Sequence, residues 1–191
     1  VKKKREELGL STEAIVILSV GEMTKNKNQE LIIRTVSEYK KKGEKICYAL
    51  CGKGTEEEHL RGLVAELGVE SEVKFLGYHK DIYEVYKMAD IFVFPSLREG
   101  MPVALMEAMA SGLPVICSDI RGNRDLLENE KGGVLVEGHK VEDYVKALEW
   151  MVENKISWEK MGDFNRRKAE KFDKKNVVGI MEKMYEAVKQ K

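Results

Sequence analysis

The sequence contains few cysteines, few prolines and no excess of either charge, and each of these scarcities excludes a class of protein. The three cysteines, Cys47, Cys51 and Cys117, are too few for a disulfide framework and have no second pair at zinc-ligand spacing. We expect them to be reduced core thiols in a cytoplasmic protein. With only three prolines, a low-complexity linker is not expected either.

Charge and hydropathy exclude two further classes. Basic and acidic residues number 33 each, so no bulk positive charge is available for binding nucleic acid or a membrane surface. No run approaches the ~18 apolar residues of a membrane span, and no signal-peptide pattern opens the chain. The 191 residues are 43% hydrophobic, which is enough for a core. Because the chain starts with Val1, we expect a single domain, residues 1–191, of a longer protein.

Short apolar runs rich in β-formers alternate with helical patterns along the chain. The runs are almost continuously apolar, which is typical of strands buried on both faces of a parallel sheet. The expected strands are Ala14–Val20, Lys45–Cys51, Val73–Leu76, Ile91–Phe94, Pro114–Ser118 and Gly133–Val136. The expected helices are Asn28–Lys42, Thr55–Leu67, Asp81–Met88, Pro102–Ser111, Asn123–Leu127, Val141–Asn154, Ser157–Phe172 and Lys175–Lys189. This order predicts an α/β domain of three layers (αβα), with a mostly parallel sheet of about six strands.

Several helix ends carry recognisable signals. Gly43 and Gly68 are expected just after two helices, where glycine is favoured. Thr55 and Glu58 have the spacing of a capping box. Pro102 suits the first position of its helix, where the missing amide proton costs nothing.

The most informative segment is LREGMPVALMEAMASGLPVICS, residues 97–118, which leads from one strand through a helix into the next. The turn at Glu99–Pro102 would direct helix N-terminal amides at the carboxyl edge of the sheet, where a phosphate could bind. Glu99 and Glu107 could each accept hydrogen bonds from a sugar diol. Their spacing alone fits equally a loop glutamate and a helix-surface glutamate that are both solvated and have no function. Glu107 is the only charged residue between Gly100 and Ser118, and such a carboxylate needs partners.

Three other loops contain weaker candidates. Lys27 could neutralise a phosphate, but solvated lysines are far more common. The segment Gly52-Lys-Gly54 is neither a Walker loop nor a complete dinucleotide fingerprint. The pair Tyr78–His79 could place backbone groups against a flat base or form a plain turn. His59 and His139 are expected on the surface, and no Asp-x-Asp suggests a site for a metal that holds a diphosphate.

Together these segments resemble the C-terminal, donor-binding half of a retaining family-four glycosyltransferase of GT-B architecture, in the group called glycosyl transferases group 1. The resemblance covers nearly the whole chain, through SVGEMTKNKNQELIIRTV, FLGY, MADIFVFPSLREGMPVALMEAMASGLPVICSD and GNRDLL. The Glu-x₇-Glu pattern, Glu99 to Glu107, is specific because it lies in that strand–loop–helix context. The resemblance implies a Rossmann-like domain that forms one half of the full architecture.

The resemblance also implies roles for individual residues. Glu99, the catalytic residue, would contact hydroxyls of the transferred sugar, Glu107 would hold the ribose diol, and Lys27 would contact the diphosphate. Backbone amides would support the sugar and phosphate, and a loop would line the base pocket. These backbone contacts would come from Gly100, Met101, Val103, Tyr78 and His79. Weaker phosphate or base contacts would come from Gly21, Lys25, Gly52 and Gly54. No cofactor and no metal is expected.

The sequence departs from the family pattern in two places. Many members carry an arginine where this chain has Glu22, which removes one expected diphosphate ligand, so Lys27 would act alone or with Lys25. Pro102 lacks an amide proton, which leaves one donor fewer in the turn. Glu22 favours an alternative reading, a non-catalytic nucleotide-sugar-binding or regulatory module. A glycoside hydrolase using Glu99 and Glu107 is a third reading, although a parallel sheet is an odd setting for it.

In the full architecture an N-terminal domain supplies the acceptor site and several catalytic side chains. Here only the segment Val1–Leu10 precedes the first strand, so the isolated chain is expected to bind the nucleotide-sugar donor weakly and to be inactive. The final helix, Lys175–Lys189, would pack partly on the missing domain. Relatives build polysaccharides, glycolipids and small glycosides, so a hexosyltransferase of polysaccharide or glycoconjugate biosynthesis is expected. Any peripheral membrane association of the parent enzyme would depend on the missing half.

Overall fold

Six parallel strands form one sheet, in the order β3-β2-β1-β4-β5-β6, in the computed structural model, which describes residues 2–43 and 45–173. All six strands expected from the sequence are present, each with ends within one residue of the prediction. They are β1 (Ile15–Val20), β2 (Ile46–Cys51), β3 (Val73–Gly77), β4 (Ile91–Phe94), β5 (Val115–Ser118) and β6 (Gly133–Val136). The four central strands are buried along almost their whole length, which explains their continuous apolar sequence.

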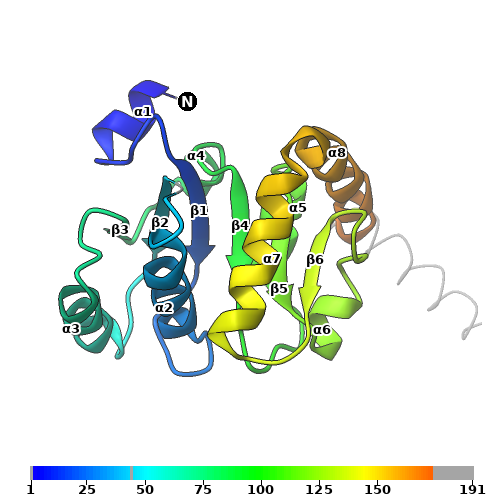
Figure 1. The fold of residues 1–191 in the computed structure, drawn as a ribbon. Coiled ribbons are helices and arrows are strands. Elements are labelled where there is room, and N and C mark those ends of the chain that lie inside the picture. The colour runs from blue at the N-terminus through cyan, green and yellow to red at the C-terminus, as the bar shows by residue number, and fades with distance from the viewer. Residues whose placement is uncertain (1, 44, 174–191) are drawn as a thin grey trace, which may run out of the picture.

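Helices connect the strands (Figure 1). They are α1 (Lys2–Glu7), α2 (Gln29–Lys40), α3 (Glu57–Leu67), α4 (Ile82–Tyr86), α5 (Val103–Ala110), α6 (Arg121–Arg124), α7 (Val141–Glu153) and α8 (Trp158–Ala169). Two 3₁₀ turns, η1 (Lys155–Ser157) and η2 (Glu170–Phe172), flank α8. The sequence did not predict α1, and it placed α6 two residues too late. The expected helix Lys175–Lys189 lies outside the described residues.

Some predicted helix signals have other roles. The N-cap of α3 is Glu56 and makes no side-chain capping bond, so the predicted capping box at Thr55 is wrong. The amide of Glu56 instead donates to the carbonyl of Met23, which anchors this end of α3 to the loop after β1. Gly68 is the C-cap of α3 in the left-handed conformation, as expected, whereas Gly43 lies three residues beyond the end of α2. Pro102 precedes the first helical residue of α5 as its N-cap.

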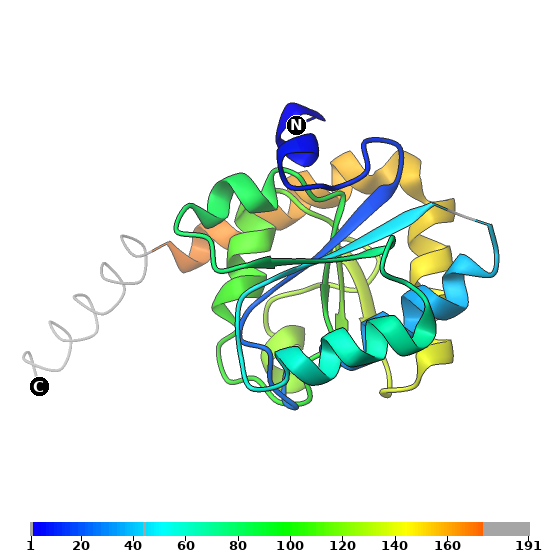
Figure 2. The same ribbon diagram turned by 90° about the vertical axis from the view of Figure 1, so that its left-hand side faces the viewer.

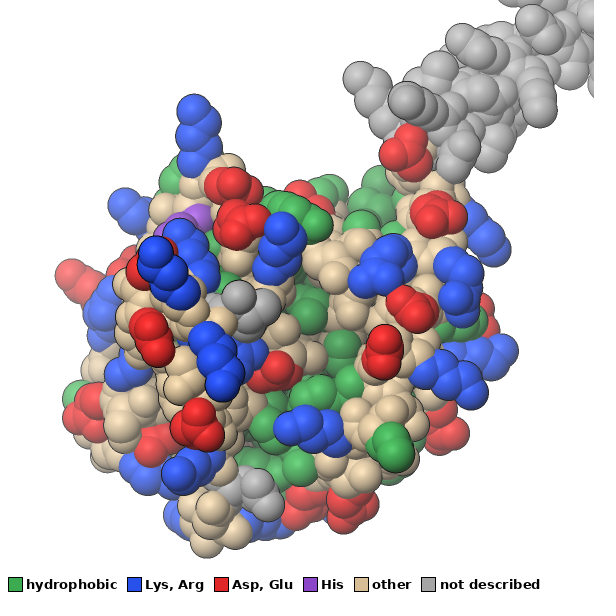
Figure 3. Space-filling view, turned by 90° about the horizontal axis from the view of Figure 1, so that it is seen from above, with side chains coloured by type: hydrophobic (Ala, Val, Ile, Leu, Met, Phe, Trp, Pro, Cys, Tyr) green, Lys and Arg blue, Asp and Glu red, His purple; other side chains and the backbone are tan. Residues whose placement is uncertain are grey.

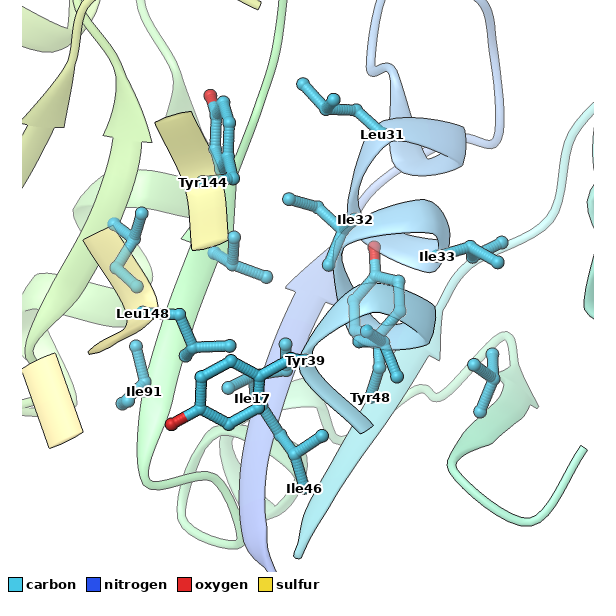
Figure 4. Close-up of a cluster of buried hydrophobic side chains, with 14 of the residues drawn as sticks. Ile17, Leu31, Ile32, Ile33, Tyr39, Ile46, Tyr48, Ile91, Tyr144 and Leu148 are labelled. Carbon is cyan, nitrogen blue, oxygen red and sulfur yellow. The ribbon is translucent and has the colours of Figure 1, made fainter. Parts of the chain in front are cut away.

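Helices cover both faces of the sheet and create two separate cores (Figure 2). On one face α2, α3 and α7 pack over β1 and β2, with a cluster that includes Ile17, Ile32, Tyr48 and Leu148 (Figure 4). On the other face α4, α5 and the end of α8 bury a second cluster around Phe92. This αβα arrangement is the three-layer domain that the sequence predicts.

The edge at which the strands begin carries α1. Arg5 of α1 is buried there: its Nε donates to the carbonyl of Met88 (2.8 Å) and its guanidinium pairs with Asp90 (2.9 Å). Viewed from this side, charged side chains of both signs surround an apolar centre (Figure 3). The loops that follow the strands lie at the opposite edge (Figure 1). Within residues 2–43 and 45–173, no helix has the length and hydropathy needed to span a membrane.

Candidate functional site

The strand order places two loops at the centre of the carboxyl edge. β1 lies between β2 and β4. The connection after β1 leads to β2 on one side of it, and the connection after β4 leads to β5 on the opposite side. In open α/β sheets, ligands bind in the crevice at this point of divergence. The loop after β1 contains Lys27, and the loop after β4 contains Glu99. Both predicted site residues therefore lie where the topology favours a ligand.

Lys27 and Glu99 form an ion pair across the two loops. Lys27 Nζ lies 2.6 Å from Glu99 Oε1, and the side chains are only 24% and 11% exposed. The ammonium also lies 4.8 Å from the centre of the Phe94 ring. Asn26 fixes the loops to each other, because its carbonyl accepts from the amide of Leu97 (2.8 Å) and its Nδ2 donates to the carbonyl of Arg98 (3.0 Å). The two loops that carry the pair are therefore hydrogen-bonded to each other by the residue next to Lys27.

The turn after Glu99 leads directly into α5. Pro102 ends the turn as the N-cap of α5, and its carbonyl accepts from the amides of Leu105 and Met106. Gly100, Met101 and Val103 are exposed, and Met101 retains 73% of its accessible surface. The three residues for which backbone contacts are predicted therefore lie on the surface of this turn, and the contacts stay a prediction.

A second layer of polar residues supports this turn from below, and the sequence reading missed it. A Cβ atom on Gly122 of α6 would lie 2.6 Å from the carbonyl oxygen of Glu99, so only glycine permits this close approach. Asn123 is fully buried and donates to the carbonyl of Ser118 (2.9 Å), while Ser118 Oγ donates to the carbonyl of Ser96 (2.6 Å). Gly122 and Asn123 lie in the segment GNRDLL, which belongs to the resemblance, but their spacing alone does not mark them as supports of the turn.

Glu107 obtains the partner that its apolar surroundings require from α4. The hydroxyl of Tyr86 donates to Glu107 Oε2 (3.0 Å) and lies 3.1 Å from the carbonyl oxygen of Ala104. Burial and the neighbouring carboxylate raise the pKa of Tyr86 far above its ordinary value, so the hydroxyl remains a donor. Glu107 also lines a cavity of about 590 Å³ between α5, α8 and η2, together with Val103 and Met106. The two acids thus contact different elements, Glu99 the loop after β1 and Glu107 the helix α4.

A cavity of about 610 Å³ lies at the ends of β1, β2 and β3. Four predicted residues line it: Gly21, Gly52, Tyr78 and His79. Tyr78 is 75% exposed, and His79 Nε2 lies 3.1 Å from the carbonyl oxygen of Leu76, to which it donates in the tautomer that is protonated at Nε2. Glu22 lines the same cavity, so the departure from the family pattern falls on its wall.

The two glycines Gly52 and Gly54 have a clear packing role. A Cβ on Gly52 would lie 1.9 Å from the carbonyl oxygen of Gly21, and one on Gly54 would lie 2.2 Å from that of Met23. The loops after β1 and β2 are joined by hydrogen bonds from Gly21 to Cys51 and from Met23 to Lys53. The glycines therefore allow two backbones to touch beneath the cavity.

The remaining candidates lie elsewhere. Lys25 is exposed and lines a different recess, of about 440 Å³, at the starts of α2 and α3. His59 and His139 are exposed, as expected, and His59 pairs with Glu30 (2.8 Å). In the described part of the chain, no three His, Cys, Asp or Glu side chains form a group that could hold a metal ion. Metal independence remains a prediction.

The fold and the carboxyl-edge loops define the class of protein: a Rossmann-like domain of the GT-B glycosyltransferases. The chain belongs to the family glycosyl transferases group 1, whose model matches residues 1–171. The Anabaena protein HepE, solved in complex with UDP and glucose, superposes with a TM-score of 0.86 over 98% of this chain and 51% of that chain, at 22% identity. The pneumococcal O-GlcNAc transferase GtfA, solved with UDP and GlcNAc, gives a TM-score of 0.82 over 94% of this chain and 37% of that chain, at 23% identity. At these identities the structures show the fold.

Two curated relatives extend the comparison. An Escherichia coli UDP-Gal:alpha-D-GlcNAc-diphosphoundecaprenol alpha-1,3-galactosyltransferase is 32% identical over 80% of this chain and 40% of its own length. A Corynebacterium jeikeium D-inositol 3-phosphate glycosyltransferase is 30% identical over 97% of this chain and 46% of its own length. The chain thus spans about half the length of the curated relatives it matches. The family argues against the reading of Glu99 and Glu107 as a glycoside hydrolase pair.

Proposed function

We propose that the chain is the donor-binding domain of a retaining glycosyltransferase, which transfers a hexose from a nucleotide diphosphate to an acceptor in polysaccharide or glycoconjugate biosynthesis. The observation that carries the proposal is the Lys27–Glu99 pair at the topological switch point, at the turn that opens α5. In the proposed complex, Lys27 turns to the diphosphate and Glu99 accepts hydroxyls of the sugar. No cofactor is part of the proposal.

The proposed mechanism follows from charge. When the glycosidic bond breaks, the nucleotide diphosphate gains negative charge, and fixed positive groups at that place lower the barrier. Lys27 and the amides at the start of α5 are such groups. Without donor, Glu99 partly neutralises Lys27 at 2.6 Å, and the donor would exchange this contact for its own. Glu107, oriented by Tyr86, would hold the ribose diol, and the 610 Å³ cavity beside Tyr78 and His79 would take the base.

Nucleotide titration tests the proposal. UDP and GDP are titrated into the chain, with binding followed by calorimetry and by the thermal midpoint. Lys27→Ala is expected to weaken binding about tenfold to a hundredfold, because a charge-assisted contact with the diphosphate is lost. Lys25→Ala serves as the matched control, since this lysine of the same loop lies in a different recess. If neither nucleotide shifts the midpoint at millimolar concentration while the chain is folded, the nucleotide site is wrong.

The two glutamates are expected to have separable effects. Glu107→Ala should weaken UDP and UDP-glucose alike, because the ribose occurs in both ligands. Glu99→Ala should leave UDP binding unchanged or slightly stronger, because Lys27 is freed, and should weaken UDP-glucose relative to UDP. Equal losses for both ligands in both variants would contradict this division of roles.

Glu22 favours a second function, a non-catalytic nucleotide-sugar-binding or regulatory module on the same fold. Glu22 lines the 610 Å³ cavity, and its negative charge would disfavour an anionic nucleotide there. A protein that also contains the proposed acceptor domain, and that binds the donor without hydrolysing or transferring the sugar, would support this module over the transferase.

A further inference from the structure

A recess of about 460 Å³ lies beside Glu99. In the strand order it lies toward β5, whereas the loop after β1 lies on the other side of β4. It is formed between the turn after β4 and the short helix α6 after β5. Its lining residues are Arg98, Glu99, Gly100, Arg121, Gly122 and Asp125. None of the roles assigned above uses the two arginines.

The fold brings these arginines together through their neighbours in sequence. Gly122 approaches the carbonyl of Glu99 so closely that a Cβ atom would lie 2.6 Å from it. Arg121 directly precedes Gly122, and Arg98 directly precedes Glu99. The two arginines therefore belong to backbone segments that lie in close contact. Asn123, fully buried, anchors α6 from below through its hydrogen bond to Ser118. The positions from which the two side chains start are therefore fixed.

The charges in this recess are not balanced. Across residues 2–43 and 45–173, neither guanidinium, Arg98 nor Arg121, has a hydrogen-bond or ion-pair partner, and both side chains are exposed. Arg124, on the same helix, pairs with Asp119 at 3.0 Å. Lys27 already neutralises Glu99. Besides Glu99, the charged residues that line the recess are thus two arginines and one aspartate, Asp125, which leaves one net positive charge.

Two guanidinium groups are suited to bind an anionic group such as a carboxylate or a phosphate. Arginine binds carboxylate and phosphate groups through parallel N–H donors, with directional as well as electrostatic preference. The recess shares Glu99 with the proposed sugar site. An anion bound there would belong to a molecule with hydroxyl groups within reach of Glu99.

We infer that the recess of Arg98 and Arg121 is an anion subsite, which takes a phosphate or carboxylate group carried by a sugar at Glu99. This inference rests on the proposed function. Two kinds of molecule could carry this anionic group: a donor whose sugar has a carboxylate, or an acceptor that has a phosphate.

The test uses the 191-residue chain and four probes: UDP, UDP-glucose, UDP-glucuronate and glucose 6-phosphate. The variant is Arg98→Gln/Arg121→Gln, and the control is Arg167→Gln, an exposed arginine of α8 away from the recess. If the donor carries the anion, UDP-glucuronate binds about tenfold more tightly than UDP-glucose, and the double variant abolishes this preference. If the acceptor carries it, glucose 6-phosphate binding weakens about tenfold in the double variant and remains unchanged in the control.

Two further results separate the subsite from the nucleotide site. UDP binding should be the same in the double variant and the control, because the arginines do not contact the nucleotide. Failure of UDP to bind any form overturns the proposed function, while glucose 6-phosphate alone still reports on the recess. If the double variant changes binding of neither UDP-glucuronate nor glucose 6-phosphate relative to Arg167→Gln, there is no anion subsite. The thermal midpoints of the variants confirm that each is folded.

Discussion

At the scale of single residues, the most informative contact joins Tyr86 and Glu107. Glu107 lies on an otherwise uncharged helix, and its carboxylate is stabilised by a hydroxyl from α4 at 3.0 Å. The same hydroxyl lies 3.1 Å from the carbonyl oxygen of Ala104, one turn earlier in α5. The orientation of Glu107 thus depends on a residue outside the Glu-x₇-Glu pattern. The Glu-x₇-Glu pattern identifies Glu107, whereas the orientation of its carboxylate is set by Tyr86 of α4.

Tyr86→Phe is therefore expected to destabilise the chain by about 1 kcal/mol, because the partly buried carboxylate of Glu107 loses its hydroxyl donor. Chemical denaturation measures this change in the free energy of unfolding. Tyr83→Phe is the matched control, since Tyr83 also lies on α4 but is exposed.

Combining Tyr86→Phe with Glu107→Gln gives a double-mutant cycle for the same contact. A coupling energy of about 1 kcal/mol is expected if the hydroxyl and the carboxylate interact directly. A coupling energy near zero would mean that Tyr86 acts only by packing.

At the scale of elements, the loops after β1 and β2 behave as one unit because their backbones touch. Gly52 → Ala introduces a Cβ atom that would meet the carbonyl of Gly21 at 1.9 Å, at a φ of +144° that disfavours any side chain. We expect a loss of about 2–4 kcal/mol of stability. Gly62→Ala, in the interior of α3 with no atom near the new Cβ, should stabilise the chain by about 0.5–1 kcal/mol. Thermal and urea unfolding of both variants would check this contrast. Similar effects of the two substitutions would contradict the backbone contact.

The sequence predicted elements whose signal is local and missed those that depend on distant contacts. All six strands were predicted because a strand buried on both faces is apolar throughout. The capping box at Thr55 was wrong because a backbone contact with Met23 competes with it. The helix α1 was missed because its main anchor, Arg5, is a charged residue whose closest polar partners, Met88 and Asp90, lie more than 80 residues later in the chain.

The candidate site was predictable to a similar extent. Lys27 and Glu99 were both chosen from the sequence, but only the strand order shows that their loops are neighbours. The family resemblance supplied the roles of the Glu-x₇-Glu acids. The supporting residues Gly122, Asn123 and Tyr86 had no distinctive spacing, since their importance comes from contacts made in the folded chain.

At the scale of the whole molecule, the proposed function makes the carboxyl edge of the sheet one half of a reaction site. The loops here offer contacts for a donor, whereas transfer also needs an acceptor held in line with it. On the proposed function, we expect the chain alone to bind UDP and to show no sugar transfer, whereas a protein that also contains the proposed acceptor domain should transfer. Release of UDP from UDP-sugars, with and without candidate acceptors, measures the difference. Transfer by the chain alone would show that the second half is dispensable.

The buried Arg5 fastens the first helix to the edge of the sheet where the strands begin (Figure 1). A tag or tether joined ahead of α1 would therefore leave the molecule on the side remote from Lys27, Glu99 and the recess of Arg98. A sensor chip that captures the chain by its amino end would orient every copy with its ligand-facing loops toward the flowing solution. The geometry of α1 thus makes immobilisation a convenient format for measuring weak nucleotide affinities.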